Sequence, residues 1–319
     1  MATYIIRRVL QALPIMFGVA VIAFAIMYLA PGDPVDRFRG TRVSAETLAN
    51  LRRLYGLDQP VHVQFISWFT AFLQFWREDS WGHSFFFARP VKDIVLERIP
   101  ATLLLGGTAL LVTVMISVPM GILAAVRQYS WADKIITTFA TIGYAIPSFL
   151  LALYLQNFLA VMVGWFPLSG MSTSLGGTDP LDIGYHMILP VASLATQQIA
   201  GWSRYVRAKM LEVLHQDYIR TAKAKGLAAS RVTFKHALRN ALIPVVTLLG
   251  LSIPGLLSGA VITETIFAWP GLGQLGVLAV VQRDYPLVLA FVMMGGFAVI
   301  LGNLLADILY GVVDPRIKY

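Results

Sequence analysis

The feature that most constrains this chain is a series of long apolar blocks without any Asp, Glu, Lys or Arg. A helix of about 20 apolar residues spans a bilayer, and a charge at the bilayer centre costs roughly 2.5–3.5 kcal/mol even on insertion scales. Uncharged blocks of this length therefore predict transmembrane helices. We expect six, at residues 9–30, 101–126, 135–163, 187–203, 243–263 and 287–306.

The composition agrees with lipid as the surrounding medium. Hydrophobic residues make up 57% of the chain and charged residues 13%, against about 45–50% and 25% in soluble domains. The first block is longer than the roughly 7–15 apolar residues of a signal peptide, so we interpret it as an uncleaved anchor. The absence of cysteine excludes disulfides, thiolate metal sites and cysteine nucleophiles.

Lys and Arg in the short loops set the predicted orientation. Fifteen of them lie before the first block, between blocks two and three, between blocks four and five, and after the sixth. The two remaining short loops hold only Arg283. Both termini and the basic loop at residues 204–243 are therefore expected in the cytoplasm. This placement accounts for most of the net charge of +8, so nucleic-acid binding is not indicated.

The region at residues 31–100 is expected outside the cell membrane and predicts two short helices. Ser44 can cap a helix over 45–55, which Gly56 would end. A second helix over 61–76 has an aromatic stripe at helical spacing, which we interpret as a packing face on lipid or another helix. A platform for stacking a ligand is the alternative. The stripe consists of Phe65, Trp68, Phe69, Phe72 and Trp76.

The sequence lacks the common catalytic motifs. It has no G-x-x-x-x-G-K-[ST] loop, no H-E-x-x-H pair and no G-x-S-x-G elbow. Its five histidines are far apart in sequence, so we predict no metal site and no catalytic residue. Ion-coupled carriers usually need charged relays within the membrane. The six apolar blocks contain no such charge, which counts against an ion-coupled carrier. The rival interpretations are such a carrier and a membrane-embedded enzyme or channel.

The most informative segment lies in the basic loop. Asp217 is expected to cap a short helix over 218–225. Gly226 would end that helix, because glycine readily adopts the left-handed conformation after a last turn. Ser230 is expected to cap a second helix over 231–243. The sequence thus predicts a helix, a glycine turn and a second helix on the cytoplasmic face.

These two helices have more structure than a topology signal needs. The second has a basic stripe and an apolar stripe, and the first places Ala222 next to Tyr218 as a small patch that a partner could approach. An exposed apolar face usually marks an interface. A role in topology alone remains the alternative for the basic stripe. The stripes are Arg231, Lys235 and Arg239, and Phe234, Leu238 and Ala241.

Two segments of the basic loop resemble a known loop. They are Y-I-R-T-A-K-A-K-G-L at 218–227 and H-A-L-R-N-A-L-I-P at 236–244. It is the loop with which inner-membrane permease subunits of ABC importers, in the oligopeptide, dipeptide and nickel branch, dock on their ATPase. The general pattern of that loop has Glu-Ala-Ala six to four residues before its glycine. Arg220, Thr221 and Ala222 stand at those places here, so the resemblance assigns no role to a glutamate.

Further motifs of this family follow in the same order along almost the whole chain. The long outer loop favours the B-type subunit over its C-type partner. The motifs are Y-I-I-R-R at 4–8, P-G-D-P at 31–34, G-L-D-Q-P at 56–60, F-P-L-S-G at 166–170, T-E-T-I-F at 263–267 with W-P-G-L-G at 269–273, and D-P-R at 314–316.

The resemblance implies an all-α membrane protein of the type I importer permease fold, with about six transmembrane helices. Its parts would be an N-terminus with the first helix (1–30), an extracytoplasmic helical loop region (31–100) and a five-helix core (101–319) that includes the coupling loop. Such a subunit lines half of an alternating-access pathway in a bacterial or archaeal inner membrane and catalyses nothing itself.

The implied partners are a second, C-type permease, two ATPase subunits and an extracytoplasmic binding protein. ATP and Mg²⁺ would bind to the ATPase subunits, so no cofactor is expected in this chain. Relatives of this kind carry peptides, nickel chelates, glutathione or oligosaccharides, and the sequence does not select among these solutes.

Two groups of residues are the candidate sites. The resemblance places ATPase coupling at Asp217, Tyr218, Arg220, Thr221, Ala222, Lys223 and Gly226. The most polar side chains deep within the apolar blocks are candidates for lining the pathway, with hydrogen bonding between helices as the alternative. They are Asn157, Gln197 and Gln198.

Overall fold

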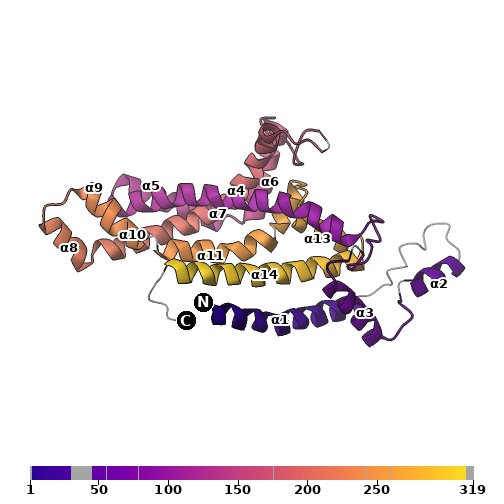
Figure 1. The fold of residues 1–319 in the computed structure, drawn as a ribbon. Coiled ribbons are helices and arrows are strands. Elements are labelled where there is room, and N and C mark those ends of the chain that lie inside the picture. The colour runs from indigo at the N-terminus through magenta and orange to yellow at the C-terminus, as the bar shows by residue number, and fades with distance from the viewer. Residues whose placement is uncertain are drawn as a thin grey trace. The chain divides into compact units, whose positions relative to one another are not determined.

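The chain is described by a computed structural model, and the regular elements in the described residues are helical (Figure 1). The strand-like pairing found there is one antiparallel bridge between His83 and Pro90. The all-α fold class is therefore confirmed. The described residues are 2–29, 45–54, 56–77, 79–174, 176–241, 243–258 and 260–313.

Three helices among the described residues are long and apolar enough to cross a membrane. They correspond to the first, second and sixth predicted blocks, and each extends beyond the predicted boundary on at least one side. The second begins ten residues earlier than expected, within the predicted outer region. They are α1 (Ala2–Leu29), α4 (Val91–Val126) and α14 (Tyr285–Val313).

The third predicted block is not one straight helix. It forms α5 (Trp131–Ala145), followed by α6 (Ser148–Leu155) and a π-helical segment, η2 (Gln156–Met162). The two halves meet at an angle of 96°. Pro147 causes the break, because a proline disfavours helical backbone in the residue before it, and Ile146 is extended at φ −82° and ψ 120°. Counted as one span, this bent pair is the fourth candidate.

The fourth and fifth blocks fall in helices that do not meet the same measure of length and apolarity. The fourth lies within α7 (Pro180–Leu214), which extends to either side of it. The fifth is divided between α11 (Ile243–Ser258) and the short α12 (Val261–Ile266). Their passage through the membrane, and hence the total of six spans, stays a prediction.

The chain divides into two compact units, residues 1–100 with 275–300, and 101–274 with 301–319. The first unit contains α1 and two short helices, α2 (Ala45–Leu54) and α3 (Val61–Leu73). Gly56 follows α2 at φ +65°, as predicted for its C-terminal glycine. The proposed cap at Ser44, and the motifs at 31–34 and 314–316, lie outside the described residues.

The aromatic stripe of α3 packs mainly on α1. Phe69 lies 5.5 Å from Phe17, and Phe65 lies 5.4 Å from Phe24, measured between ring centroids in edge-on geometry. Such pairs contribute about 0.5–1.5 kcal/mol beyond the area that they bury. Packing between helices, the first interpretation of the stripe, is therefore observed. Trp76 is an exception, since α3 ends at Leu73 and Trp76 is 68% exposed.

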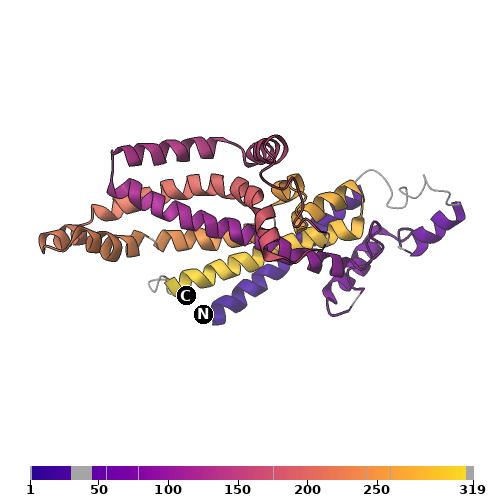
Figure 2. The same cartoon turned by 90° about the horizontal axis from the view of Figure 1, so that it is seen from above.

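Glycines allow close contacts between helices in the second unit. α5 packs along α7, and both views show the two helices side by side (Figure 1 and Figure 2). A Cβ on Gly121 of α4 would lie 2.6 Å from the Cβ of Val206 in α7. A Cβ on Gly302 of α14 would lie 2.6 Å from the backbone nitrogen of Pro254 in α11. Glycine at both positions lets the helix backbones touch.

Candidate functional site

The short helix of the basic loop is present as α8 (Asp217–Ala224). Its N-cap is Gln216, whose extended backbone precedes the helix and whose side chain makes no capping bond. The predicted cap at Asp217 is therefore wrong by one residue. Asp217 instead stands in the first turn, where a carboxylate interacts favourably with the positive end of the helix dipole.

Gly226 ends α8 as predicted, at φ +74°. Its N–H donates to the carbonyl of Lys223 at 3.0 Å, and the N–H of Leu227 donates to the carbonyl of Ala222 at 3.4 Å. These two bonds form a Schellman motif, which satisfies the last carbonyls of the helix and requires a left-handed residue. The turn thereby fixes the direction in which the chain leaves α8.

One side of α8 is buried in the chain's own core. Ile219 is fully buried, and Ala222 is 8% exposed. Burying a side chain such as Ile219 contributes about 1.5–3 kcal/mol, so this contact fixes α8 to α4, α7 and α11. The other members of the cluster are Ala125 of α4, Val206 and Met210 of α7, Val245 of α11, and Val232, Ala237 and Ala241 of the intervening segment.

This burial corrects one prediction about the loop. Ala222 does not offer an open patch to a partner, because it packs inward on that cluster. The outward side of α8 instead presents Tyr218, Arg220, Thr221 and Lys223, all of which are exposed. A helix of eight residues thus separates into an anchoring side and a free side.

The second helix of the loop begins earlier and is less regular than predicted. It opens as α9 (Ala229–Arg231) with Ala228 at the N-cap, so Ser230 lies inside the helix and does not cap it. A π-helical segment, η3 (Val232–Ala237), and α10 (Leu238–Ala241) follow. The side chains of Phe234 and Arg239 lie outside the described residues.

Within that segment, Leu238 packs on the inward cluster and Ala241 belongs to it, in line with the predicted apolar stripe. Arg231 and Lys235 are exposed. The hydroxyl of Tyr218 accepts a hydrogen bond from Asn240 Nδ2 at 2.8 Å, which connects α8 to α10. The two parts of the loop therefore form one packed element.

An ion pair that the sequence analysis missed lies next to this element. Arg207 of α7 donates to both carboxylate oxygens of Asp133 in α5, at 2.6 and 2.8 Å. The Asp133 carboxylate also accepts from the backbone N–H of Tyr129 at 2.9 Å and from Thr137 Oγ1 at 3.2 Å. Bidentate pairs of this kind fix geometry as well as adding energy. The pair joins α5 to the part of α7 that supports α8.

The three candidate pathway residues differ in their surroundings. Asn157, in η2, is exposed, whereas Gln197 and Gln198 of α7 are half-buried. Gln198 lines a cavity of about 260 Å³ between α4, α7 and α11, together with small residues such as Gly106 and Gly255. The structure does not bring Asn157 to this cavity.

Gln156, next to Asn157, was missed and has a structural role. Its Nε2 donates to the carbonyls of Leu168 and Ile266, at 2.9 and 3.0 Å. These bonds tie η2 to the end of α12. Gln156 therefore forms hydrogen bonds between helices, which was the alternative to pathway lining for the polar side chains in the apolar blocks.

The motif at 263–273 is organised by a buried carboxylate, which the sequence analysis quoted without assigning a role. Glu264 is fully buried. It accepts hydrogen bonds from Thr102 Oγ1 at 3.0 Å, from the N–H of Gly273 at 2.7 Å and from the N–H of Gln274 at 3.1 Å. The last two begin α13 (Leu272–Val281), so the carboxylate satisfies donors at a helix N-terminus.

Glycines in this motif make room for the carboxylate. A Cβ on Gly271 would lie 2.3 Å from Oε2 of Glu264. The quoted motif, in which Glu264 is followed by P-G-L-G at 270–273, was the available signal in the sequence. In the described residues no group of His, Asp and Glu side chains is arranged to hold a metal ion.

Comparison with known proteins gives consistent matches over the whole chain. The family model described as binding-protein-dependent transport system inner membrane component matches residues 117–319. The model of the N-terminal part of the same kind of membrane component matches residues 1–106. Together these two matches cover nearly every residue.

Two curated relatives match from end to end. The chain is 45% identical over 320 residues to the oligopeptide transport system permease protein AppB of Bacillus subtilis (strain 168), covering 100% of both chains. It is 38% identical over 319 residues to the glutathione transport system permease protein GsiC of Salmonella choleraesuis (strain SC-B67), again with 100% of both covered.

A solved structure supports the fold. A chain of the MetNI methionine ABC transporter, in an inward-facing conformation, matches with a TM-score of 0.54 and 18% identity. The match covers 70% of this chain and 98% of the other. At that level of identity the likeness concerns the arrangement of helices alone.

Proposed function

Because the chain belongs to the family of binding-protein-dependent transport system inner membrane components, we propose that it forms half of the solute channel of an ATP-driven importer. The partners in this proposal are a second, homologous permease, two cytoplasmic ATPase subunits and an extracytoplasmic binding protein. Hydrolysis of ATP belongs to the ATPase subunits, and this chain converts their movement into opening of the channel. Both termini lie in the cytoplasm.

The observation that best supports this proposal is the two-sided character of α8. Its inward side, at Ile219 and Ala222, packs on residues of α4, α7 and α11. Its outward side is exposed and polar, with Tyr218 in the first turn and Thr221 near the middle. A helix that is anchored on one side and free on the other can dock in a groove of a partner and transmit a push to the helices beneath it.

Transmission needs rigidity, and three contacts supply it. The Schellman turn at Gly226 fixes the C-terminal end of α8, and the bond from Asn240 to Tyr218 fixes its first turn. The pair of Arg207 with Asp133 connects the supporting end of α7 to α5. A displacement of α8 would therefore move several membrane helices together and not only bend the loop.

The proposed solutes are peptides or related compounds. The two relatives described above are named for oligopeptide and glutathione transport, and this chain matches each over its full length. Gln198 offers neutral hydrogen-bonding groups in the cavity between α4, α7 and α11. Neutral polar groups suit solutes that vary in side-chain charge, because they do not select a sign.

Substitutions on the free side of α8 test the coupling role. Thr221→Trp places a large side chain on the exposed side, where the hydroxyl of Thr221 donates to the carbonyl of Asp217 in its own helix. Gly226→Val forces a β-branched residue into the left-handed turn, at a cost of about 1–2 kcal/mol. Both variants are expected to insert normally, to lose the ATPase subunit during co-purification and to lose uptake.

Ser174→Trp is the matched control for ATPase retention, because it adds the same bulk at an exposed residue of the predicted outer loop. Gly226→Asn is a second control, since asparagine tolerates the left-handed conformation. If Thr221→Trp and Gly226→Val both keep the ATPase and transport normally, α8 is not the docking element.

A further inference from the structure

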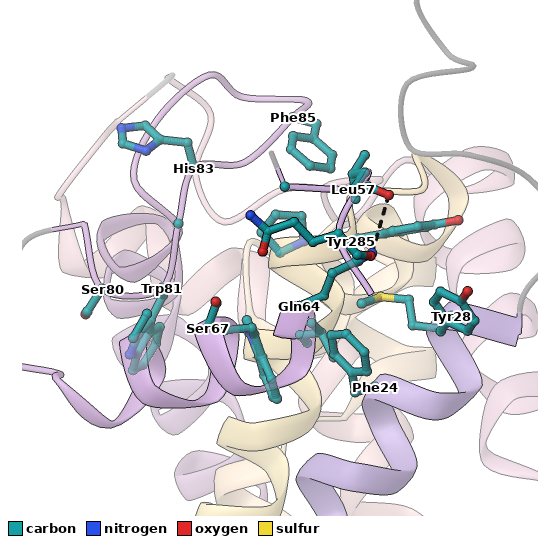
Figure 3. A pocket seen from close by; sticks show the side chains of 18 of the residues that line it. Phe24, Tyr28, Leu57, Gln64, Ser67, Ser80, Trp81, His83, Phe85 and Tyr285 are labelled. Carbon is teal, nitrogen blue, oxygen red and sulfur yellow. Dashed lines mark hydrogen bonds between the residues drawn. The ribbon is translucent and has the colours of Figure 1, made fainter. Parts of the chain in front are cut away.

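A cavity of about 780 Å³ lies in the first unit (Figure 3). Its walls come from the C-terminal end of α1, from α3, from the loop at residues 79–85 and from the first turn of α14. The end of α2 and the turn at residues 56–59 complete the rim. Sites for small molecules have volumes of about 300–1,000 Å³, so this cavity is large enough for a ligand.

The ends of two membrane helices place this cavity at a membrane–water boundary. The span of α1 runs over Ile6–Leu29 and that of α14 over Tyr285–Ile308. The cavity is lined by Phe24 and Tyr28 near the end of the first, and by Tyr285 at the start of the second. At 1.5 Å per residue, these side chains lie within about 8 Å of the ends of the spans.

The lining changes from apolar to polar in a way that suits an amphiphile. Phe24, Met27 and Trp68 form an apolar part, and Trp81 and Tyr285 add the residue types that are enriched at membrane interfaces. In Figure 3, Phe24 and Tyr28 of α1 lie on one side of the cavity. Ser80 and Trp81, in the loop that follows α3, lie on the other side.

The polar rim has both signs of charge. Arg53 of α2 and Asp79 both line the cavity and are exposed. Asp79 also lies 3.6 Å from Nε2 of His83, an ion pair only when that imidazole is protonated. The side chains of Asp79 and His83 are 72% and 51% exposed, so both remain accessible to a ligand.

The walls are held by hydrogen bonds of the chain itself. The buried carboxylate of Asp284 accepts from Ser84 Oγ and from the N–H of Phe86 at 3.0 Å, which fixes the loop to the start of α14. Gln64 Nε2 donates to the carbonyl of Gln59 at 2.8 Å and to that of Leu57 at 3.4 Å, which closes the turn over the rim. The cavity is therefore preformed.

We propose that this cavity binds a single zwitterionic membrane phospholipid with an ethanolamine head group. One acyl chain lies between Phe24, Met27 and Trp68, in continuity with the leaflet around α1. The phosphate pairs with Arg53, whose guanidinium fits phosphate oxygens well, and the ammonium pairs with Asp79. The lipid thereby joins the 79–85 loop and α3 to the leaflet, independently of which solute is transported.

Native mass spectrometry of the full-length chain, purified in mild detergent with any subunits that stay bound, tests the site. Ser67 lines the cavity, is exposed and points into it in Figure 3. Ser67→Phe is expected to fill the space and to reduce the lipid-bound fraction by about tenfold. Thr70→Phe adds the same ring one turn further along α3, outside the lining, and is expected to retain the lipid.

Competition between phosphatidylethanolamine and phosphatidylglycerol tests the head group without changing the shape of the cavity. The wild-type chain is expected to prefer phosphatidylethanolamine, and Asp79→Asn to lower that preference by about tenfold. Equal lipid retention in Ser67→Phe and Thr70→Phe would overturn the site. A preference that Asp79→Asn and Arg53→Gln both leave unchanged would overturn the assignment of the head group.

Discussion

At the scale of single residues, Glu264 is the side chain with the most hydrogen bonds to other elements in its motif. Its carboxylate receives donors from α4 and from the first turn of α13. Thr102 adds a second connection, because its Oγ1 also accepts from the N–H of Leu272 at 2.7 Å. Glu264 therefore joins two helices that are far apart in sequence, and its predicted effect is on stability.

Glu264→Ala removes the acceptor of the buried N–H of Gly273. An unsatisfied buried donor costs about 1–3 kcal/mol, so thermal unfolding in detergent should occur at a clearly lower temperature. Glu264→Gln keeps one acceptor oxygen, so its unfolding temperature should lie between those of the wild type and of Glu264→Ala. Thr102→Val, which removes one hydroxyl at nearly constant volume, should also be intermediate. A melting temperature unchanged in Glu264→Ala would contradict this account.

The candidate pathway residues can be separated by thiol labelling in this cysteine-free chain. Gln198→Cys faces the cavity between α4, α7 and α11, and Asn157→Cys lies on an exposed part of η2. A bulky thiol reagent is expected to block uptake through the Gln198→Cys variant and to leave the Asn157→Cys variant active. Full uptake after complete labelling of both positions would leave only a packing role for Gln198.

At the scale of elements, sequence reasoning located the helices better than their ends. Gly226 was predictable because a positive φ has a strong residue preference. The cap expected at Asp217 lies one residue earlier, at Gln216, and the cap expected at Ser230 lies two residues earlier, at Ala228. Neither observed cap makes a side-chain capping bond, so the preference for short polar caps did not locate these helix starts. A proline at residue 147 is visible in the sequence, but the size of the bend, 96°, depends also on how η2 packs, for example through Gln156.

The pair of Asp133 with Arg207 predicts coupling between α5 and α7. Asp133→Ala leaves the guanidinium without its bidentate partner, and Arg207→Ala leaves a carboxylate that is 5% exposed without its counter-ion. Each single variant should reduce the melting temperature. The double variant should be destabilised by less than the sum of the two, because contacting residues are not additive. Strict additivity of the melting shifts would show that the pair does not act as a unit.

At the scale of the whole molecule, the order of apolar blocks and the basic loops predicted an all-helical membrane subunit. The same information could not predict which side of α8 is buried, because Ala222 meets Val206 and Val245 only after distant segments pack together. The cavity beside α1 and α14 has the same origin, with walls from residues more than 200 positions apart. Sequence periodicity contains no information on contacts of that range.

The orientation of the chain in the membrane is the prediction that involves all of its loops at once. Fifteen Lys and Arg lie in the short loops expected in the cytoplasm and one in those expected outside, and such an imbalance sets orientation. Ser174 and Ser230 lie in loops of opposite predicted side and are both exposed, so each can react once it is replaced by cysteine.

In intact cells, Ser174→Cys should react with a membrane-impermeant maleimide, and Ser230→Cys should react only after the membrane is permeabilised. Since the chain has no other cysteine, each signal reports one site. Uptake by both variants serves as the control for correct assembly. Labelling of Ser230→Cys from outside, with Ser174→Cys protected, would invert the orientation. It would also move α8 away from the compartment that holds ATP, so the coupling role would fail together with the topology.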